Sequence, residues 1–467
     1  MSNCDPTNYG SLDLPAELIQ RYGNNLPRYT SYPTAAEFTP TFGSPDWEKD
    51  LFRELQENPE SPISIYCHLP FCVSLCYFCA CNKIISKKRD PVEPYLNALR
   101  SEISQLAGRF SRLPAVAQLH WGGGTPNYLT PQEIDILMNE LRRNFPKFLQ
   151  GADISIELDP RTVSNHHLQT LHTLGFNRLS FGVQDFDPEV QRVINRIQPY
   201  EAVARLCNES RALGFGGINM DLIYGLPKQS EKSFESTLEK VCRLRPDRIA
   251  LYGYAHVTWV SKTQRVFDKH ARPSSDLRLK LFQLALQRLA GEGYRYIGMD
   301  HFALAKDPMA AACEDGTLHR NFMGYSTHKT ATLLGFGMSS ISTIPGAYAQ
   351  NYRAIKEYTA AVREGRIPVE RGLRRSAEDR WRGAAIQSVM CSQPIYFEEF
   401  ERSWGIDLRD TMRLEIVQAL KDDALAEVDD EKLAVTPKGR FFLRNIAAIF
   451  DSYLPSHVQS KTFSQAV

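Results

Sequence analysis

Short apolar runs alternate with longer amphipathic segments through the first two thirds of the chain. Apolar runs of this length predict buried strands, and segments whose apolar residues recur every three or four positions predict helices. The predicted strands are Ile63–His68, Ala115–His120, Asp153–Leu158, Arg178–Val183, Gly217–Ile223 and Arg248–Tyr254. Among the segments between them, Tyr95–Phe110 carries its Leu, Ile and Phe side chains along one helical face. Six β/α units in series predict a parallel sheet with the helices outside it.

Six units are fewer than the eight of a closed barrel, so we expect an α/β fold built on a partial (β/α)6 barrel. In such a fold the chemistry lies at the C-terminal ends of the strands. The repeat ends after about residue 310. We therefore expect an N-terminal extension, the barrel, a connecting segment that completes the active site, and a mostly helical C-terminal domain. Their expected limits are residues 1–61, 62–310, 311–374 and 375–467. The extension, with its run Arg28–Pro33, is either a lid over the barrel mouth or a strap whose aromatic side chains pack on the barrel.

The C-terminal domain has its own pattern. Residues 375–453 are mostly of helical period, with one hairpin formed by Leu425–Val428 and Leu433–Val435. A further helix is expected from about Pro437. Helix, hairpin and helix in this order predict a small domain that resembles a winged helix.

Composition narrows the functional classes. The chain has 467 residues, 43% of them hydrophobic, and a formal net charge of +1. A net charge this small gives no overall field that attracts nucleic acid or an anionic membrane. No apolar run is long enough to span a membrane, and the polar stretch Met1–Gly10 lacks the features of a signal peptide. We therefore expect a cytoplasmic protein that binds neither membrane nor nucleic acid.

Five of the ten cysteines lie between Cys67 and Cys81. Without a signal peptide, a cluster this tight indicates metal binding or redox chemistry. Cys72, Cys76 and Cys79 have the spacing C-x3-C-x2-C, and thiolates suit either zinc or an iron–sulfur cluster. Three thiolates can hold three irons of a [4Fe–4S] cluster, which leaves the fourth iron free to bind another molecule.

The alternative is a structural zinc loop in which Cys81 is the fourth ligand. Only one residue separates Cys79 from Cys81, whereas zinc ligands in such loops are usually two to four residues apart. The C-x3-C-x2-C spacing with an aromatic residue, Phe78, before the last cysteine is typical of the radical S-adenosylmethionine (SAM) superfamily. Cys81 is then either a thiol with an accessory role beside the cluster or a packed one.

Five further features lie at or after the ends of predicted strands. The glycines of Trp121–Pro126 allow a ligand to approach the backbone closely. Glu157, Gln184 and Asp221 are polar residues at the ends of apolar strands, where an unpaired polar group is costly. Arg196 follows the fourth strand and can bind a carboxylate with two hydrogen bonds. These residues either contact SAM or form ordinary structural pairs.

Six segments together resemble the oxygen-independent coproporphyrinogen III oxidases over about residues 15–453. These segments are Arg28–Pro33, Tyr66–Asn82, Trp121–Pro126, Gly182–Phe186, Asp221–Pro227 and Gly298–Phe302. The resemblance implies conversion of two propionate groups of coproporphyrinogen III to vinyl groups, giving protoporphyrinogen IX in haem and tetrapyrrole biosynthesis. It also implies a [4Fe–4S] cluster, two SAM molecules and a 5′-deoxyadenosyl radical that removes hydrogen from the propionate.

The same resemblance assigns residues. Cys72, Cys76 and Cys79 are implied as the cluster ligands, and no side chain is assigned a catalytic role, because the radical comes from SAM. The implied SAM contacts are Tyr66, Phe78, Gly123, Gly124, Thr125, Glu157, Gln184, Arg196, Asp221, Ala255 and Ile341. The expected partners are coproporphyrinogen III and a reducing electron donor such as flavodoxin or ferredoxin, and we expect a monomer.

Two other functions fit part of the pattern. A haem chaperone related to these enzymes shares the cysteine loop, but its relatives typically lack the run Arg28–Pro33 and the Cys-x-Cys ending at Cys81. A radical SAM RNA-modifying enzyme would explain a winged-helix-like tail. The tail alternates Arg409, Arg413 and Lys421 with acidic residues, which does not favour RNA binding.

Overall fold

The computed structural model describes residues 15–270, 272–412, 414–454 and 463, so Met1–Gly10 lies outside the described residues. Its centre is a twelve-stranded sheet. Six strands of this sheet run parallel and in chain order: β1 (Ile63–Leu69), β4 (Val116–Gly123), β5 (Phe148–Leu158), β6 (Arg178–Gln184), β7 (Gly217–Tyr224) and β8 (Arg248–Gly253). All six predicted strands are confirmed, and the sheet is the predicted partial barrel rather than a closed one.

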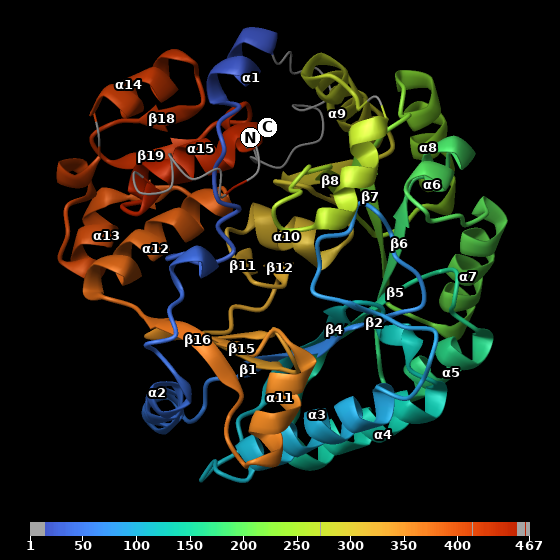
Figure 1. Cartoon of the computed structure of the whole chain (residues 1–467). Helices are drawn as coiled ribbons and strands as arrows, with labels where there is room; N and C mark the ends of the chain where they lie inside the picture. The colour runs from blue at the N-terminus through green and yellow to red at the C-terminus, as the bar shows by residue number, and fades with distance from the viewer. Residues whose placement is uncertain (1–14, 271, 413, 455–462, 464–467) are drawn as a thin grey trace.

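Helices cover the outer face of these strands (Figure 1). They are α3 (Val92–Ala107), α4 (Pro131–Asn144), α5 (Asn165–Thr173), α6 (Pro188–Val193), α7 (Tyr200–Leu213) and α8 (Glu231–Leu244). α4 begins at a capping box in which the Thr130 hydroxyl accepts from the Glu133 N–H and the Glu133 carboxylate accepts from the Thr130 N–H. Leu99 and Ile103 of α3 are fully buried, as the predicted apolar face requires.

The inner face of the sheet is polar. Along β4, the fully buried Leu119 and Trp121 point to the helices, whereas Gln118 and His120 line a cavity on the other face. Successive side chains of a strand point to opposite faces, so each parallel strand carries one apolar and one polar row. The polar row continues across the sheet through Ser155, Glu157, Ser180, Asn219 and Asp221. Glu157 is therefore one of several polar side chains on this face and does not stand alone among apolar ones.

The sheet extends beyond the predicted repeat at both edges. β13 (Thr332–Phe336) pairs parallel with β1, and β14 (Ile341–Ile344), β15 (Ala347–Asn351) and β16 (Val369–Arg374) follow it in antiparallel order. At the other edge β10 (His301–Leu304) lies antiparallel between β8 and β9 (Tyr294–Gly298). The sequence pattern did not predict these strands, because they have only four to six residues and lie outside the β/α repeat. The helices of this region are α9 (Ser275–Gly291), α10 (Pro308–Glu314) and α11 (Ile355–Arg363).

The C-terminal elements pack as a separate group beside the barrel (Figure 1). They are α12 (Ala377–Met390), β17 (Ile395–Tyr396), α13 (Phe397–Trp404), α14 (Leu414–Asp422), β18 (Ala426–Val428), β19 (Lys432–Val435) and α15 (Leu443–Ala447). The predicted hairpin is present as β18 and β19, and β17 adds a third strand to it. In place of the helix expected from about Pro437, a 3-10 turn over Gly439–Phe442 leads into the short α15.

The N-terminal segment connects both groups. It contains α1 (Ala16–Tyr22) and α2 (Ser44–Glu57), and between them runs a strap formed by residues 28–33. The strap is fastened to the C-terminal group, because the Tyr29 hydroxyl donates to Asp451 over 2.9 Å and the Tyr32 hydroxyl lies 2.9 Å from that of Ser452. Both tyrosine rings are 3% exposed. The rings of the strap are therefore packed side chains rather than free ones.

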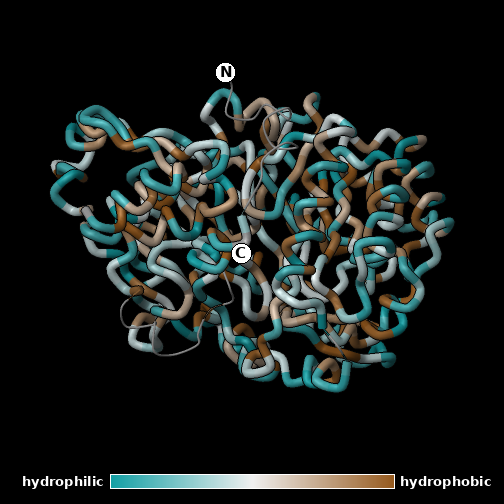
Figure 2. Tube along the Cα trace, turned by 90° about the horizontal axis from the view of Figure 1, so that it is seen from above, coloured by the Kyte–Doolittle hydropathy of each residue, from teal (hydrophilic) through white to brown (hydrophobic). Residues whose placement is uncertain are grey.

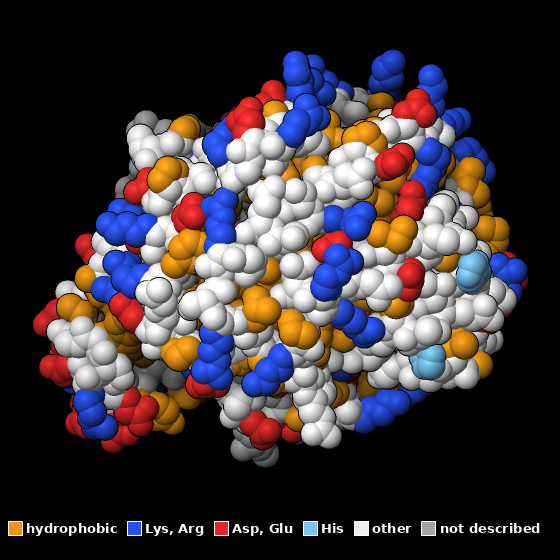
Figure 3. Space-filling model, turned by 90° about the horizontal axis from the view of Figure 1, so that it is seen from below, with side chains coloured by type: hydrophobic (Ala, Val, Ile, Leu, Met, Phe, Trp, Pro, Cys, Tyr) orange, Lys and Arg blue, Asp and Glu red, His pale blue; other side chains and the backbone are white. Residues whose placement is uncertain are grey.

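The surface is mixed in character. Seen from above in Figure 2, hydrophobic stretches run through the interior of the β/α part and hydrophilic stretches lie at its margin. On the face shown in Figure 3, Lys and Arg side chains intermingle with Asp and Glu, and hydrophobic side chains are scattered. None of the helices that the structure describes is both long and apolar enough to cross a membrane.

A buried carboxylate joins the first helix of the barrel to the added strands. Glu102 of α3 is 6% exposed and accepts three hydrogen bonds. These come from the Gly337 N–H after β13 over 2.8 Å, the Asn351 side-chain amide of β15 over 2.6 Å and the Tyr358 hydroxyl of α11 over 2.6 Å. Three elements that the repeat did not predict are thus held by one side chain.

We expect Glu102→Ala to lower the free energy of unfolding by about 2–4 kcal/mol, because it leaves the buried Gly337 N–H and Tyr358 hydroxyl without an acceptor and removes one of the two acceptors of the Asn351 amide. Equilibrium denaturation in urea measures this change. Asn97→Ala, on the exposed face of the same helix, is the matched control and should shift stability by less than about 0.5 kcal/mol. Equal effects of the two variants would contradict a structural role for the Glu102 network.

The same carboxylate predicts a pH dependence. Burial raises the pKa of Glu102 to about 7 from its ordinary value of 4.5. Between these pH values the folded chain keeps a proton that the unfolded chain releases, so the stability from this group falls as the pH rises. We expect the stability difference between the wild type and Glu102→Gln to shrink from pH 5 to pH 7.5 in urea denaturation. A difference that stays constant or grows over this range would show that Glu102 is charged in the folded protein.

Candidate active site at the barrel mouth

The predicted cluster ligands lie on the loop after β1. The short strands β2 (Phe71–Cys72) and β3 (Ile84–Ile85) pair and close the base of this loop. Cys72 ends β2, and Cys76 and Cys79 follow within the loop. Cys76 is buried, whereas Cys72 and Cys79 are half-buried. The loop therefore presents three thiols close together in the chain at the C-terminal end of the first strand.

Hydrogen-bond donors surround these sulfur atoms. The Thr125 hydroxyl donates to Cys72 Sγ over 3.3 Å. Arg196 and Arg161 donate to Cys76 Sγ over 3.4 Å and 3.6 Å. Both guanidinium groups also bind the carboxylate of Asp159, and although burial opposes it, Arg196 and then Arg161 hold the pKa of Asp159 below its usual range. Arg196 thus lies beside a predicted cluster ligand, and the sequence did not reveal Arg161 or Asp159.

These residues fit an iron–sulfur cluster. Burial raises the pKa of Cys72 to about 11, so its thiolate requires a cationic partner at neutral pH. Iron provides that charge, and the donors from Thr125, Arg161 and Arg196 stabilise sulfur that carries negative charge. In the described part of the chain, no three His, Cys, Asp or Glu side chains are arranged as ligands of a single metal ion.

Cys81 lies apart from the other three in character. It is exposed and lines the main cavity of the barrel mouth. A hydrogen bond with Cys81 lowers the pKa of Cys79 although burial opposes it, and the positive charge of Lys83 lowers it further. The Lys83 ammonium is held nearby, since it donates to the Cys79 carbonyl over 2.9 Å. Cys81 is therefore placed to act on Cys79 and to face a ligand in the cavity.

This mouth cavity has a volume of about 840 Å³. Four predicted SAM contacts line it together, namely Tyr66, Gly123, Glu157 and Ile341. The Glu157 carboxylate accepts from the Gly123 N–H over 3.1 Å and lies 3.4 Å from His120 Nε2. Although burial opposes it, the hydrogen bond with His120 lowers the pKa of Glu157, which therefore faces the cavity as a carboxylate.

Two glycines allow the backbone to pass beneath this cavity. A Cβ atom on Gly124 would lie 2.4 Å from the Pro70 carbonyl oxygen, so no other residue fits there without movement of the cluster loop. Gly123 has φ +115°, which side chains rarely adopt, and a Cβ there would lie 2.5 Å from the His68 ring. The glycine motif therefore sets the distance between β4 and the cluster loop.

A second set of predicted contacts lies on the other side of the cluster loop. Gln184 and Arg196 adjoin one another, since a Cβ on Gly182 would lie 3.1 Å and 2.9 Å from their side-chain nitrogens. Phe78 packs against a hydrophobic cluster that contains Tyr254, the residue before Ala255. Thr125 reaches this region through its bond to Cys72. The structure thus divides most of the predicted contacts between two places and does not gather them in one cavity.

Asp221 lies deeper, in an inner cavity of about 150 Å³ that Glu157 also lines. Its carboxylate accepts from the Asn219 side-chain amide over 2.8 Å and from the Ser180 hydroxyl over 3.2 Å. Burial and the nearby charge of Glu157 raise the pKa of Asp221 to about 7. Asp221 therefore has structural partners and still faces the polar interior of the barrel.

Sequence reasoning missed several polar side chains of the mouth. His68 lies 3.1 Å from the Tyr66 hydroxyl, and His120 Nδ1 lies 2.8 Å from the Ser155 hydroxyl. Tyr252 lines both the mouth cavity and the inner cavity. The period-two alternation of polar residues within β4 and β8 is the signal that would have found His120 and Tyr252.

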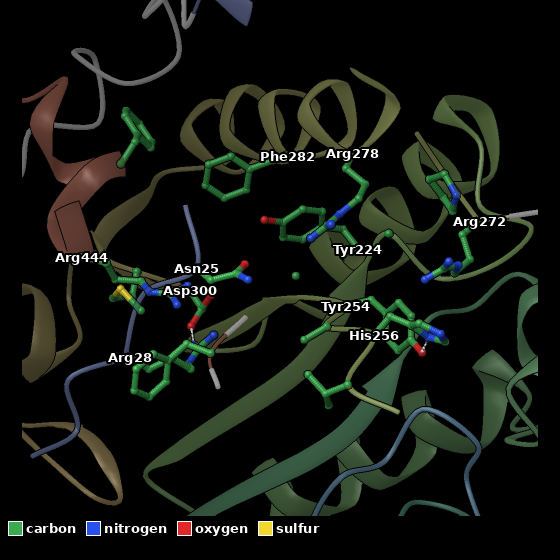
Figure 4. Close-up of a pocket in the computed structure, with 18 of the residues that line it drawn as sticks. Asn25, Arg28, Tyr224, Tyr254, His256, Arg272, Arg278, Phe282, Asp300 and Arg444 are labelled. Atoms are coloured by element: carbon green, nitrogen blue, oxygen red, sulfur yellow. Dashed lines mark hydrogen bonds and ion pairs between the residues drawn. The ribbon is translucent and has the colours of Figure 1, made fainter. Parts of the chain in front are cut away.

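A further cavity of about 510 Å³ lies beside the strap (Figure 4). Arg28 of the strap forms an ion pair with Asp300, which belongs to the motif Gly298–Phe302. In Figure 4 this pair lies at one side of the cavity, and Arg278 and Tyr224 lie at the other. Ala255 lines the same cavity, which places it apart from Tyr66 and Glu157.

Comparison with known proteins agrees with this geometry. The Radical SAM superfamily model matches residues 66–241, and the HemN C-terminal domain model matches residues 376–442. Oxygen-independent coproporphyrinogen III oxidase from Synechocystis is 40% identical over 99% of this chain and 100% of its own length. The protein of that name from Escherichia coli is 43% identical, with 98% of this chain and 99% of its own length covered.

A solved structure gives the same result. It is described as coproporphyrinogen III oxidase (HemN) from Escherichia coli, a radical SAM enzyme. It superimposes with a TM-score of 0.89 at 43% identity and covers 95% of this chain and 99% of its own. This match includes the barrel, the added strands and most of the C-terminal group. The chain belongs to the oxygen-independent coproporphyrinogen III oxidases of the radical SAM superfamily.

Proposed function

We propose that the chain catalyses the oxidative decarboxylation of two propionate groups of coproporphyrinogen III to vinyl groups, giving protoporphyrinogen IX in haem biosynthesis. The enzyme is a radical SAM oxidoreductase whose cofactors are a [4Fe–4S] cluster and two SAM molecules. The observation that carries the proposal is the cysteine loop, whose sulfur atoms accept hydrogen bonds from Thr125 and Arg196, beside the mouth cavity that Glu157 lines. The chain that contains this site matches these oxidases over nearly its full length. The haem chaperone and the RNA-modifying enzyme are not favoured.

When bound, the cluster and SAM supply a 5′-deoxyadenosyl radical that takes a hydrogen atom from the propionate carbon next to the pyrrole ring. We assign Cys72, Cys76 and Cys79 as the cluster ligands. Tyr66 and Glu157 would bind polar groups of one SAM molecule in the mouth cavity, together with Gly123 and Ile341. The division of the predicted contacts into two places supports a second SAM molecule. Its contacts would be Phe78, Gln184, Arg196 and Ala255.

The other side chains of the site position the cluster loop and the ligands. The three donors on sulfur from Thr125, Arg161 and Arg196 hold the cluster loop in one arrangement and tune the charge on it. The Gly124 contact with Pro70 keeps β4 close enough for the backbone of Gly123 to bind a ligand. Asp221 and Glu157 supply carboxylates to the inner face. Positioning of the propionate within reach of the radical is the main contribution of the protein.

The partners follow from this chemistry. We propose coproporphyrinogen III as the substrate and a reducing protein such as flavodoxin or ferredoxin as the electron donor. We further propose that the protein acts as a monomer in the cytoplasm, without nucleic acid.

The division into an extension over residues 1–61, a barrel over 62–310, a connecting segment over 311–374 and a C-terminal domain over 375–467 remains our proposal. Anaerobic turnover of coproporphyrinogen III with SAM and dithionite, with protoporphyrinogen IX and carbon dioxide as products, tests the function.

The assigned cluster ligands predict the iron content of the protein. Anaerobically prepared wild type should contain about four irons and four sulfides per chain, and Cys76→Ala should lose nearly all of them. Cys81→Ser is the matched control and should keep the full iron content, although its activity can fall, because Cys81 is only one residue from Cys79. Iron and sulfide analysis measures both. Stoichiometric zinc in the wild type, or loss of iron from Cys81→Ser alone, would contradict the assignment.

The assignment of SAM to the mouth cavity predicts the effect of a change at Glu157. Glu157→Gln should weaken SAM binding about 10- to 100-fold, because a carboxylate that accepts hydrogen bonds from a ligand contributes roughly 1.5–3 kcal/mol. Equilibrium dialysis of labelled SAM against cluster-loaded protein measures the affinity, and the iron content should stay unchanged. Glu370→Gln is the control, since Glu370 lines the same cavity but pairs with Arg353 over 3.0 Å. An equal loss in both variants would place SAM elsewhere.

A further inference from the structure

A cavity outside the site described so far has a one-sided charge. It has a volume of about 450 Å³ and lies between the strap, the hairpin of β11 (His319–Asn321) and β12 (Gly324–Ser326), strand β14 and helix α12. The charged Lys and Arg side chains that line this basic cavity are Arg320, Lys329, Arg375 and Arg380. Among the described residues, no Asp or Glu lines it. Aromatic and aliphatic side chains, including Phe322 and Tyr348, form its walls.

Among the side chains that line this cavity, six buried polar atoms have no hydrogen-bond partner within the described structure. They are Arg320 Nε and Nη1, Arg375 Nε, Asn321 Nδ2 and the hydroxyls of Ser31 and Thr343. Buried polar groups are normally paired, so a set of unpaired ones on a single cavity indicates a ligand. Most of these atoms are donors from cations or an amide, so the ligand must offer acceptors.

Arg320 makes the strongest case. It is 5% exposed, and its guanidinium lies over the Tyr325 ring with 4.7 Å to the centroid. Within the described residues, no carboxylate forms an ion pair with it. Burial, and then repulsion by Arg320, lowers the pKa of Arg28 nearby. A buried cation without an anion is costly for the folded protein, so a position of this kind is best explained by an anion that binds there.

The basic cavity adjoins the mouth cavity. Phe322 and Leu333 line both of them, so a ligand in the basic cavity reaches the wall of the space that contains Glu157 and Cys81. A tetrapyrrole substrate has an apolar ring body with carboxylates on flexible arms. While one propionate reacts at the barrel mouth, at least one other propionate must be held elsewhere. A cavity with apolar walls and unpaired cationic donors has the chemistry to hold it.

We propose that the basic cavity binds the carboxylates of the propionate groups that are not reacting, with Arg320 as the buried residue that recognises them. Arg375 binds from the side of the sheet, and Lys329 and Arg380 supply positive charge at the exposed rim. This inference rests on the proposed function, since it takes the substrate to be a polycarboxylate tetrapyrrole. Arg320 is then a residue that sets substrate specificity and takes no part in radical formation.

The test measures binding directly. Cluster-loaded protein is titrated with coproporphyrin III, the stable oxidised analogue, and with its tetramethyl ester, and porphyrin fluorescence reports the dissociation constant. We expect Arg320→Gln to bind coproporphyrin about 10- to 100-fold more weakly than the wild type. The ester lacks carboxylates, so the two proteins should bind it with similar affinity. Loss of discrimination between acid and ester is the specific signature of carboxylate recognition.

Two controls separate recognition from folding. Arg402→Gln removes an exposed cation of α13 that does not line the cavity, and this variant should bind coproporphyrin as the wild type does. The melting temperature of ligand-free Arg320→Gln should equal or exceed that of the wild type, because the substitution removes an unpaired buried charge. If Arg320→Gln fails to fold or to keep its cluster, a double variant with Lys329→Gln and Arg380→Gln at the rim tests the carboxylate site instead. It should weaken coproporphyrin binding at least several-fold and leave ester binding unchanged.

The outcomes distinguish this inference from the proposed function. Unchanged coproporphyrin affinity in Arg320→Gln, or an equal loss for acid and ester together with a lower melting temperature, overturns the assignment of the cavity. If the wild type does not decarboxylate coproporphyrinogen but Arg320→Gln still loses acid binding selectively, the proposed function fails while the carboxylate site stands. If the wild type turns over and Arg320→Gln binds like it, the cavity assignment alone fails.

Discussion

The parallel pairing of six consecutive strands is the constraint on which the site depends. A parallel ladder brings the C-terminal ends of β1, β4, β5, β6, β7 and β8 to one edge of the sheet. At this edge the cysteine loop follows β1, the glycine motif lies at the end of β4, and Glu157 is the penultimate residue of β5. The cysteine loop and Glu157, which are distant in the chain, therefore meet because of the strand pairing itself. The antiparallel strands beyond β13 and β8 extend the sheet at its two edges.

The period-two alternation of those strands decides what the barrel contains. The row that faces the helices is apolar and stabilises the fold, since Leu119, Ile156 and Leu222 are fully buried. The row that faces inward is polar, and its members satisfy one another, as Asn219 and Ser180 do with Asp221. Such a network is stable only when its groups are paired, so the barrel interior is already organised before a ligand arrives.

The sequence predicted the repeating part of this fold well, because each of the six strands has an apolar row and ordinary length, and amphipathic helical segments separate the strands. It did not predict β9, β10 and β13–β16, which are short and hold their places through partners distant in the chain, such as Glu102 for the turn at Gly337. The cysteine spacing identified the loop, whereas Arg161 and Asp159 were missed. Their roles follow from the three-dimensional meeting of β5 with the cluster loop, and no local pattern marks them.

The strap shows how the two groups of elements depend on each other. Arg28 reaches Asp300 in the barrel, while Tyr29 and Tyr32 bind Asp451 and Ser452 at the end of the C-terminal group. The strap therefore lies across both, and its residues 29–32 also line the basic cavity. The wall of the basic cavity comes mainly from three separate parts of the chain, namely the strap, the region from β11 to β14, and α12. The cavity keeps its shape only while these parts stay together. The fastening of the strap by buried hydroxyl and guanidinium contacts thus maintains the shape of the cavity as well as the stability of the fold.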